Sequence, residues 1–212
     1  MMRILLLLSW MAVVPAAPGS GLPAGLVLGE GAEVSRNGLP AAPAAAGELL
    51  YAGDVVTGRK AVRVLSCMDR MMGTLPAGVA ATVEARGVMA ERWETRTPVK
   101  SCYLPAVTKG PVGGPKHLGA MMVRSLGETG TGTRAERMAG LPEAERGALE
   151  RELAALAGET PEMMVMRGVL YQRARLFLDA REEYEAALKA WPRAVWLKTL
   201  MIAAEDAAQR AR

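Results

Sequence analysis

The sequence has little of the chemistry on which most enzyme active sites depend. It contains one histidine, His117, and two cysteines, Cys67 and Cys102, in 212 residues. A single histidine excludes zinc sites built on paired imidazoles and leaves any Ser-His-Asp triad dependent on His117, which lies in a Gly- and Pro-rich segment. The cysteines form no CxxC pair with a lowered thiol pKa. We therefore predict no catalytic residue, no bound metal and no cofactor, and we expect a protein that is not an enzyme.

Long apolar runs are also lacking. The run from Ile4 to Val14 is about 11 residues, whereas a helix needs about 20 to span a bilayer. Arg3 precedes this run and Pro15-Ala-Ala-Pro18 follows it, which is the pattern of a secretory signal peptide. We expect residues 1–17 to be that signal peptide, with a periplasmic or secreted product and no stable membrane insertion after cleavage. Retention of the run as a membrane anchor is the alternative.

Neither sign of charge dominates the chain. Lys and Arg number 26 and Asp and Glu number 22, so the net charge is +4. The basic residues are interspersed with Glu and form no block with aromatic residues, which does not favour nucleic acid as a partner. An acidic run at Glu182, Glu183 and Glu185 is expected to be a solvated helix face that pairs with Arg181 and Lys189.

The chain has 14 methionines, some in doublets such as Met71-Met72 and Met163-Met164. Thioethers bind Cu(I), so a copper site is one interpretation. No MxxM repeat or neighbouring histidine supports it, and we interpret the methionines as filling irregular cores.

An exported chain reaches an oxidising compartment, where an even pair of cysteines normally forms a disulfide. Each cysteine lies in a short strand-like run, at residues 61–67 and 100–104. We predict a Cys67–Cys102 bond that closes a loop of roughly 35 residues and adds roughly 4 kcal/mol to the stability of the surrounding domain. A free redox-active thiol is the alternative.

Residues 26–105 have the pattern of an antiparallel β domain, a small sandwich or barrel. Short β-branched runs at 32–36, 61–67 and 79–85 alternate with turn residues. Asn37-Gly38 is the dipeptide that best supplies the positive φ angles of a tight hairpin turn. We therefore expect a hairpin that turns at these two residues.

A further pattern within this domain resembles the hallmark stretch of the FecR-like domain. Two dipeptides within it, Gly53-Asp54 and Thr57-Gly58, each contain a glycine and are expected to form tight turns. The resemblance covers about residues 26–90 and implies a periplasmic β module without catalytic residues. The positions that carry it are Gly47, Leu50, Gly53, Asp54, Val55 and Thr57-Gly58.

Residues 106–142 are rich in Gly, Pro and Thr, and we expect a linker there, with one strand candidate at 118–126. From residue 143 onward, apolar residues recur at helical spacing. We therefore expect a helical domain at 143–212.

Within the helical domain, six residues match the 34-residue TPR signature when Pro161 is counted as the first position. The resemblance implies helix A at about 161–176 and helix B at about 181–191, packed antiparallel. Helices at 143–157 and 193–210 are expected to cap this one repeat. The matching residues are Gly168, Tyr171, Ala180, Tyr184, Ala187 and Pro192.

In TPR-like arrays the concave face is lined mainly by helix A, so the resemblance implies that Arg167 and Arg173 are candidates for partner binding. The sequence thus predicts a multidomain β + α protein, in which a β domain precedes a TPR-like helical domain. We expect an exported bacterial envelope protein that acts as a non-catalytic interaction or adaptor module for other envelope proteins or peptide segments. A structural protein associated with the cell wall and an envelope hydrolase are the alternatives.

Overall fold

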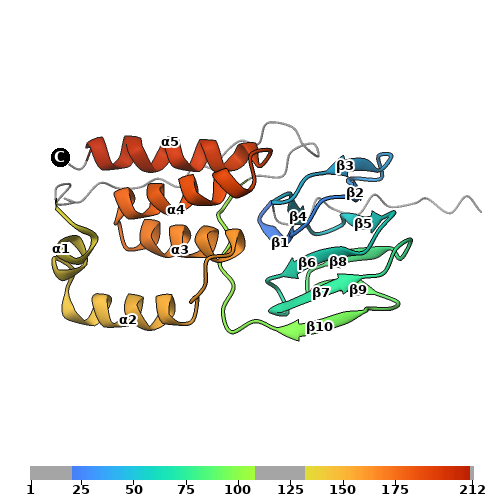
Figure 1. Cartoon of the computed structure of the whole chain (residues 1–212), viewed down its shortest axis with the longest axis horizontal. Helices are drawn as coiled ribbons and strands as arrows, with labels where there is room; N and C mark the ends of the chain where they lie inside the picture. The colour runs from blue at the N-terminus through green and yellow to red at the C-terminus, as the bar shows by residue number, and fades with distance from the viewer. Residues whose placement is uncertain (1–20, 108–131, 211–212) are drawn as a thin grey trace, which may run out of the picture.

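The computed structural model describes residues 21–107 and 132–210, and it places a β domain beside a stack of helices (Figure 1). The predicted signal peptide, the strand candidate at 118–126 and His117 lie outside the described residues. Within them, ten strands form two antiparallel sheets, with the orders β10-β7-β6-β1-β4 and β3-β2-β5-β8-β9. The strands are β1 Pro23–Val27, β2 Ala32–Ser35, β3 Ala42–Ala44, β4 Leu49–Tyr51, β5 Val55–Gly58, β6 Val62–Ser66, β7 Met71–Leu75, β8 Ala81–Glu84, β9 Gly87–Ala90 and β10 Thr95–Pro98.

The two sheets pack face to face around a core of small aliphatic side chains. Val62 and Val64 of β6 meet Val34 of β2 and Val56 of β5 there, and each is at most 1% exposed. Alternate residues of a strand point to one face of its sheet, so Val62 and Val64 face this core together. Of the two predicted forms, sandwich or barrel, the chain forms the sandwich.

The predicted hairpin turn is confirmed. Asn37 and Gly38 have φ angles of 57° and 72°, and the N–H of Leu39 donates to the carbonyl oxygen of Arg36 at 3.1 Å. Positive φ at both central residues gives the turn a twist that matches the flanking strands. The turn therefore joins β2 to β3 as expected.

Two strand-level predictions were wrong. Thr57-Gly58 is not a turn but the end of β5, and the chain turns at residues 59–60 instead. Residues 100–104 form no strand, because the neighbouring edge of β7 is already paired with β10. These residues instead continue away from the sheet toward the helices.

The helices are α1 Arg134–Ala139, α2 Glu143–Ala154, α3 Pro161–Arg173, α4 Phe177–Ala190 and α5 Val195–Arg210. The segment expected to be a linker thus contains a helix, α1. Thr133 caps this helix reciprocally with Glu136, a capping box that the Thr-x-x-Glu spacing encodes.

Helices α3 and α4 form a hairpin, and α4 also packs on α5. The helix A expected at 161–176 ends at Arg173, because Arg175 adopts a φ of 63° and reverses the chain within three residues. Helix B consequently begins at Phe177, four residues earlier than expected. It ends at Ala190, just before Pro192, which cannot continue a helix.

One buried cluster joins the sandwich to the helices. Leu26, Tyr51 and Leu65 lie on the outer face of the first sheet and pack in the same cluster as Trp191 and Trp196 from the helical region. Figure 1 shows the connection between α4 and α5 at the end of the helical stack that faces the sheets. We refer to this cluster as the junction core.

Candidate functional site

The centre of the junction core is a close contact between a glycine and two tryptophans. The indole N–H of Trp196 donates to the carbonyl oxygen of Gly47 at 2.8 Å. Gly47 has a φ of +83°, and a Cβ atom on it would lie 2.7 Å from the ring of Trp191. Only glycine combines this backbone conformation with this approach. Gly47 is therefore a contact point between the sandwich and the helices.

The connecting segment, which we define as residues 99–107, runs from the end of β10 into the junction core. The predicted disulfide is confirmed: Cys67, directly after β6, is bonded to Cys102, with their Cα atoms 5.2 Å apart. The phenol of Tyr51 donates to the carbonyl oxygen of Val107 at 3.0 Å. Burial raises the pKa of this phenol, an effect that the nearby charge of Arg36 opposes.

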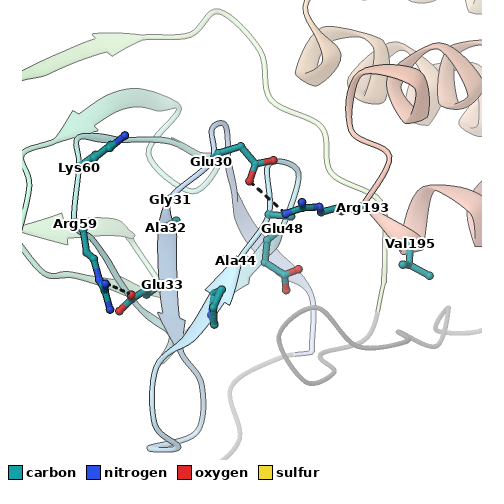
Figure 2. Close-up of a pocket in the computed structure, with 12 residues that line it drawn as sticks. Glu30, Gly31, Ala32, Glu33, Ala44, Glu48, Arg59, Lys60, Arg193 and Val195 are labelled. Carbon is teal, nitrogen blue, oxygen red and sulfur yellow. Dashed lines mark ion pairs between the residues drawn. The ribbon is translucent and has the colours of Figure 1, made fainter.

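A cleft of about 710 Å³ lies where the edge of the second sheet meets the start of α5 (Figure 2). We call it the junction cleft. Small apolar residues line part of it, including Pro43, which is exposed, and Val195, which is 43% exposed. Charged residues of both signs surround them, and Figure 2 shows Arg193 extending toward Glu30 from the helical side. The charged lining residues are Glu30, Glu33, Glu48, Arg59, Lys60 and Arg193.

Two ion pairs lie at the rim of the junction cleft. Arg193 pairs with Glu30 at 3.8 Å, and Arg59 pairs with Glu33 at 3.4 Å. The side chains of Arg193 and Arg59 are 76% and 91% exposed, so each pair is worth at most about 1 kcal/mol. These charges can therefore exchange partners at little cost. The cleft presents exchangeable acceptors and donors around an apolar surface, which suits binding of a polypeptide.

A buried ionic cluster stands behind one wall of the junction cleft. The guanidinium of Arg36 donates to the carboxylate of Asp54 at 2.9–3.2 Å and to Glu48 at 3.3 Å. Asp54 is fully buried and also accepts from the N–H of Tyr51 at 3.0 Å. The expected turn at Gly53-Asp54 is present, since Gly53 has a φ of +87°. Asp54 therefore fixes the turn that precedes β5 and orients the strand beside the cleft.

β3 is an edge strand and borders the junction cleft. Its central residue is Pro43, which has no N–H to donate to a further strand. Proline in an edge strand discourages the addition of another strand. Contacts by side chains are therefore the better suited mode of binding in this cleft.

The two arginines predicted to bind a partner are in different environments. Arg167 is only 17% exposed and is bonded to Glu183 at 2.9 Å, as well as to the carbonyl oxygens of Leu156 and Gly158. It therefore ties the loop before α3 to α4. Arg173 is exposed, and its guanidinium lies 5.7 Å from the ring centre of Tyr103 in the connecting segment.

The residues predicted to pack α3 on α4 come together. Tyr184 is fully buried, and a Cβ atom on Gly168 would overlap its ring. Tyr184 donates from its hydroxyl to the side-chain oxygen of Gln172 at 2.8 Å, and burial raises its pKa. Tyr171, Ala180 and Ala187 are also buried, whereas Pro192 is exposed after the end of α4.

An arginine cluster that the sequence did not reveal holds α1 against α4. Arg137 is 7% exposed and bonds both oxygens of Asp179, at 2.7 and 2.9 Å. Arg134 bonds Asp179 at 3.0 Å, bonds Glu182 and Glu183, and lies over the ring of Tyr171 at 5.1 Å. The bidentate geometry is the strong form of an arginine–carboxylate contact.

The expectation of a fully solvated acidic face was therefore partly wrong. Glu183 is 6% exposed and faces the arginine cluster, because α1 covers this part of α4. Glu185 does pair with Lys189, at 3.3 Å, as expected. Arg181 pairs instead with Glu205 of α5, at 3.8 Å.

Three further findings concern membranes, metals and relatives. In the parts of the chain that the structure describes, no helix has both the length and the apolar character needed to cross a bilayer. Among residues 21–107 and 132–210, no group of three or more His, Cys, Asp or Glu side chains is placed to hold a metal ion. Comparisons with protein-family models, curated proteins and solved structures found no match to this chain.

Proposed function

We propose that this chain is an exported bacterial envelope protein that acts as a non-catalytic interaction or adaptor module. The observation that carries the proposal is the junction cleft, because its walls come from both the sandwich and the helical stack. Ligand sites occur preferentially at such boundaries between structural units. The junction core holds the two walls together, so a partner meets one composite surface.

The partner that suits this surface is a peptide segment of another envelope protein, with small apolar residues and charges of both signs. The apolar residues would cover Pro43 and Val195, and the charges would replace the partners in the rim pairs Glu30–Arg193 and Glu33–Arg59. Side-chain docking of this kind fits an edge strand that carries Pro43.

The disulfide supports export, because such bonds persist in oxidising compartments. The resemblance of part of the sandwich to the FecR-like domain and that of the helical hairpin to a TPR also support this function. The helical hairpin offers a second surface, where Arg173 remains our candidate for partner contact. Under this proposal the sandwich and the hairpin are both binding modules.

Site-specific photo-crosslinking in cells of the native host tests this function. A photoreactive amino acid replaces Lys60 on the sandwich wall or Val195 on the helical wall. Matched control positions are Ile202 on α5, which is 55% exposed against 43% for Val195, and Met89 on β9. We expect the cleft positions to form adducts with the same discrete protein bands, and the control positions to form none.

The rival functions give different outcomes. Adducts with wall polymer, together with co-sedimentation of the protein with that polymer, would favour a structural role in the cell wall. Turnover of a panel of hydrolase substrates would favour an enzyme. Equal adducts at cleft and control positions would contradict the assignment of the cleft as the docking site.

A further inference from the structure

The disulfide lies at the junction between the two parts of the molecule and not in the sandwich core. Cys67 and Cys102 both pack against the junction core, whereas the core between the two sheets is formed by other residues. The bond joins the end of β6 to the connecting segment, and its two cysteines are separated by 35 positions in the sequence. The bond is therefore placed to affect how the helices dock on the sandwich, in addition to how the sandwich itself folds.

The connecting segment makes direct contact with both sides of the junction. Its residue Tyr103, next to Cys102, lies beneath the guanidinium of Arg173 on α3. Val107 is fully buried in the junction core and is bonded to Tyr51 of β4. The disulfide thus fixes the connecting segment, which the helices contact, to the end of β6.

We infer that the Cys67–Cys102 bond is a redox-sensitive lock on the docking of the helical stack against the sandwich. Both cysteines are partly exposed, so a thiolate of a reductant can reach the bond. A dithiol reductant supplies two electrons and two protons: the S–S bond breaks, two thiols form on this protein, and the reductant leaves as its own disulfide.

Reduction frees the connecting segment from β6 while leaving the sandwich core intact. The junction then opens more often, since one of the links that hold the segment in place is lost. The junction cleft has walls from both parts, so reduction weakens partner binding as well. This last consequence rests on the proposed function, whereas the effect on docking does not.

Hydrogen–deuterium exchange of the full chain, measured by mass spectrometry, tests the lock. The oxidised protein is compared with protein held in excess dithiothreitol. We expect amide exchange to become about tenfold faster in the connecting segment, in β4 and at the start of α5 after reduction. Strands β5 and β8 should keep their rates, because none of their residues belongs to the junction core or lines the junction cleft.

A variant with Cys67→Ala and Cys102→Ala is the matched control. It should exchange like the reduced protein and should not respond to dithiothreitol. Unchanged exchange on reduction would overturn the lock, as would equal acceleration in β5 and β8, which would show that the bond stabilises the whole β domain.

Photo-crosslinking at Val195 under the same two conditions separates this inference from the proposed function. If exchange accelerates at the junction and no adduct forms at Val195 under either condition, the lock stands and the junction cleft is not where the partner binds. If exchange accelerates and the adducts persist, the lock stands and partner binding does not depend on it. If exchange accelerates and the adducts disappear, both proposals are supported.

Discussion

Trp196 donates its indole N–H to the carbonyl oxygen of Gly47 across 149 residues of sequence. Through this contact the start of α5 is bonded to the loop before β4. The ring of Trp191, the residue that follows α4, covers the same glycine. Two tryptophans and one glycine therefore set how the helical stack meets the sandwich.

Gly47→Ala should destabilise the protein through two effects. The positive φ disfavours any residue with a Cβ, at about 1–2 kcal/mol, and the new methyl group overlaps the Trp191 ring, at about 1–3 kcal/mol more. Gly53→Ala is the matched control, because Gly53 has a similar φ of +87° and nothing within 4 Å of its Cβ position. Urea denaturation of both variants isolates the overlap. Equal losses in the two variants would show that the contact with Trp191 is not tight.

Gly168→Ala should destabilise the helical hairpin although alanine is the better helix former. The added methyl group meets the buried ring of Tyr184, and we expect a loss of about 1–3 kcal/mol. Gly147→Ala on α2 should instead stabilise by about 0.5–1 kcal/mol, because the nearest atom to its Cβ is 3.6 Å away. Shifts in the urea midpoint measure both changes. If both variants gain stability, the TPR register counted from Pro161 is wrong.

Features with a local signal were predictable from the sequence. Asn37-Gly38 identified its turn because positive φ favours those residue types, and the export pattern together with an even cysteine count identified the Cys67–Cys102 bond. The resemblance to the TPR signature, in which Gly168 and Tyr184 are two positions, implied the helix pair, and the Tyr184 ring occupies the space that Gly168 leaves without a side chain. In each case the identity of the residue constrains the structure directly.

Features that join distant segments were not predictable. The junction cleft combines the β2–β3 edge with Arg193 and Val195, and no periodicity links these parts of the chain. Arg137 follows a Gly- and Thr-rich stretch, where an arginine is usually solvated, yet it is buried against Asp179. The capping-box spacing of Thr133 and Glu136 was the available sign that a helix begins there.

Glu136 should titrate below the usual pH range of a glutamate. The backbone N–H and the hydroxyl of Thr133 donate to its carboxylate, and these hydrogen bonds lower its pKa from the usual 4.5. The charged form is favoured in the folded state, so its contribution to stability is complete above pH 4.5 and is lost as the pH falls through the lower folded-state pKa. Carbon-13 NMR of the carboxyl group measures this value. Thr133→Val should raise it part of the way back, since the backbone donor remains, and an unchanged pKa in that variant would show that the hydroxyl is not involved.

Arg137→Leu should cost about 3 kcal/mol, because it leaves the fully buried carboxylate of Asp179 with Arg134 as its remaining arginine partner. Replacing both members, as in Arg137→Leu with Asp179→Leu, should recover much of that loss, since an apolar pair carries no desolvation penalty. Lys189→Leu is the control: its pair with Glu185 is exposed, and its removal should change stability by about 0.5 kcal/mol or less. Urea denaturation of Arg137→Leu, Asp179→Leu and the double variant gives the coupling energy of the pair. A double variant as unstable as Arg137→Leu alone would mean that α1 is held by contacts other than the arginine cluster.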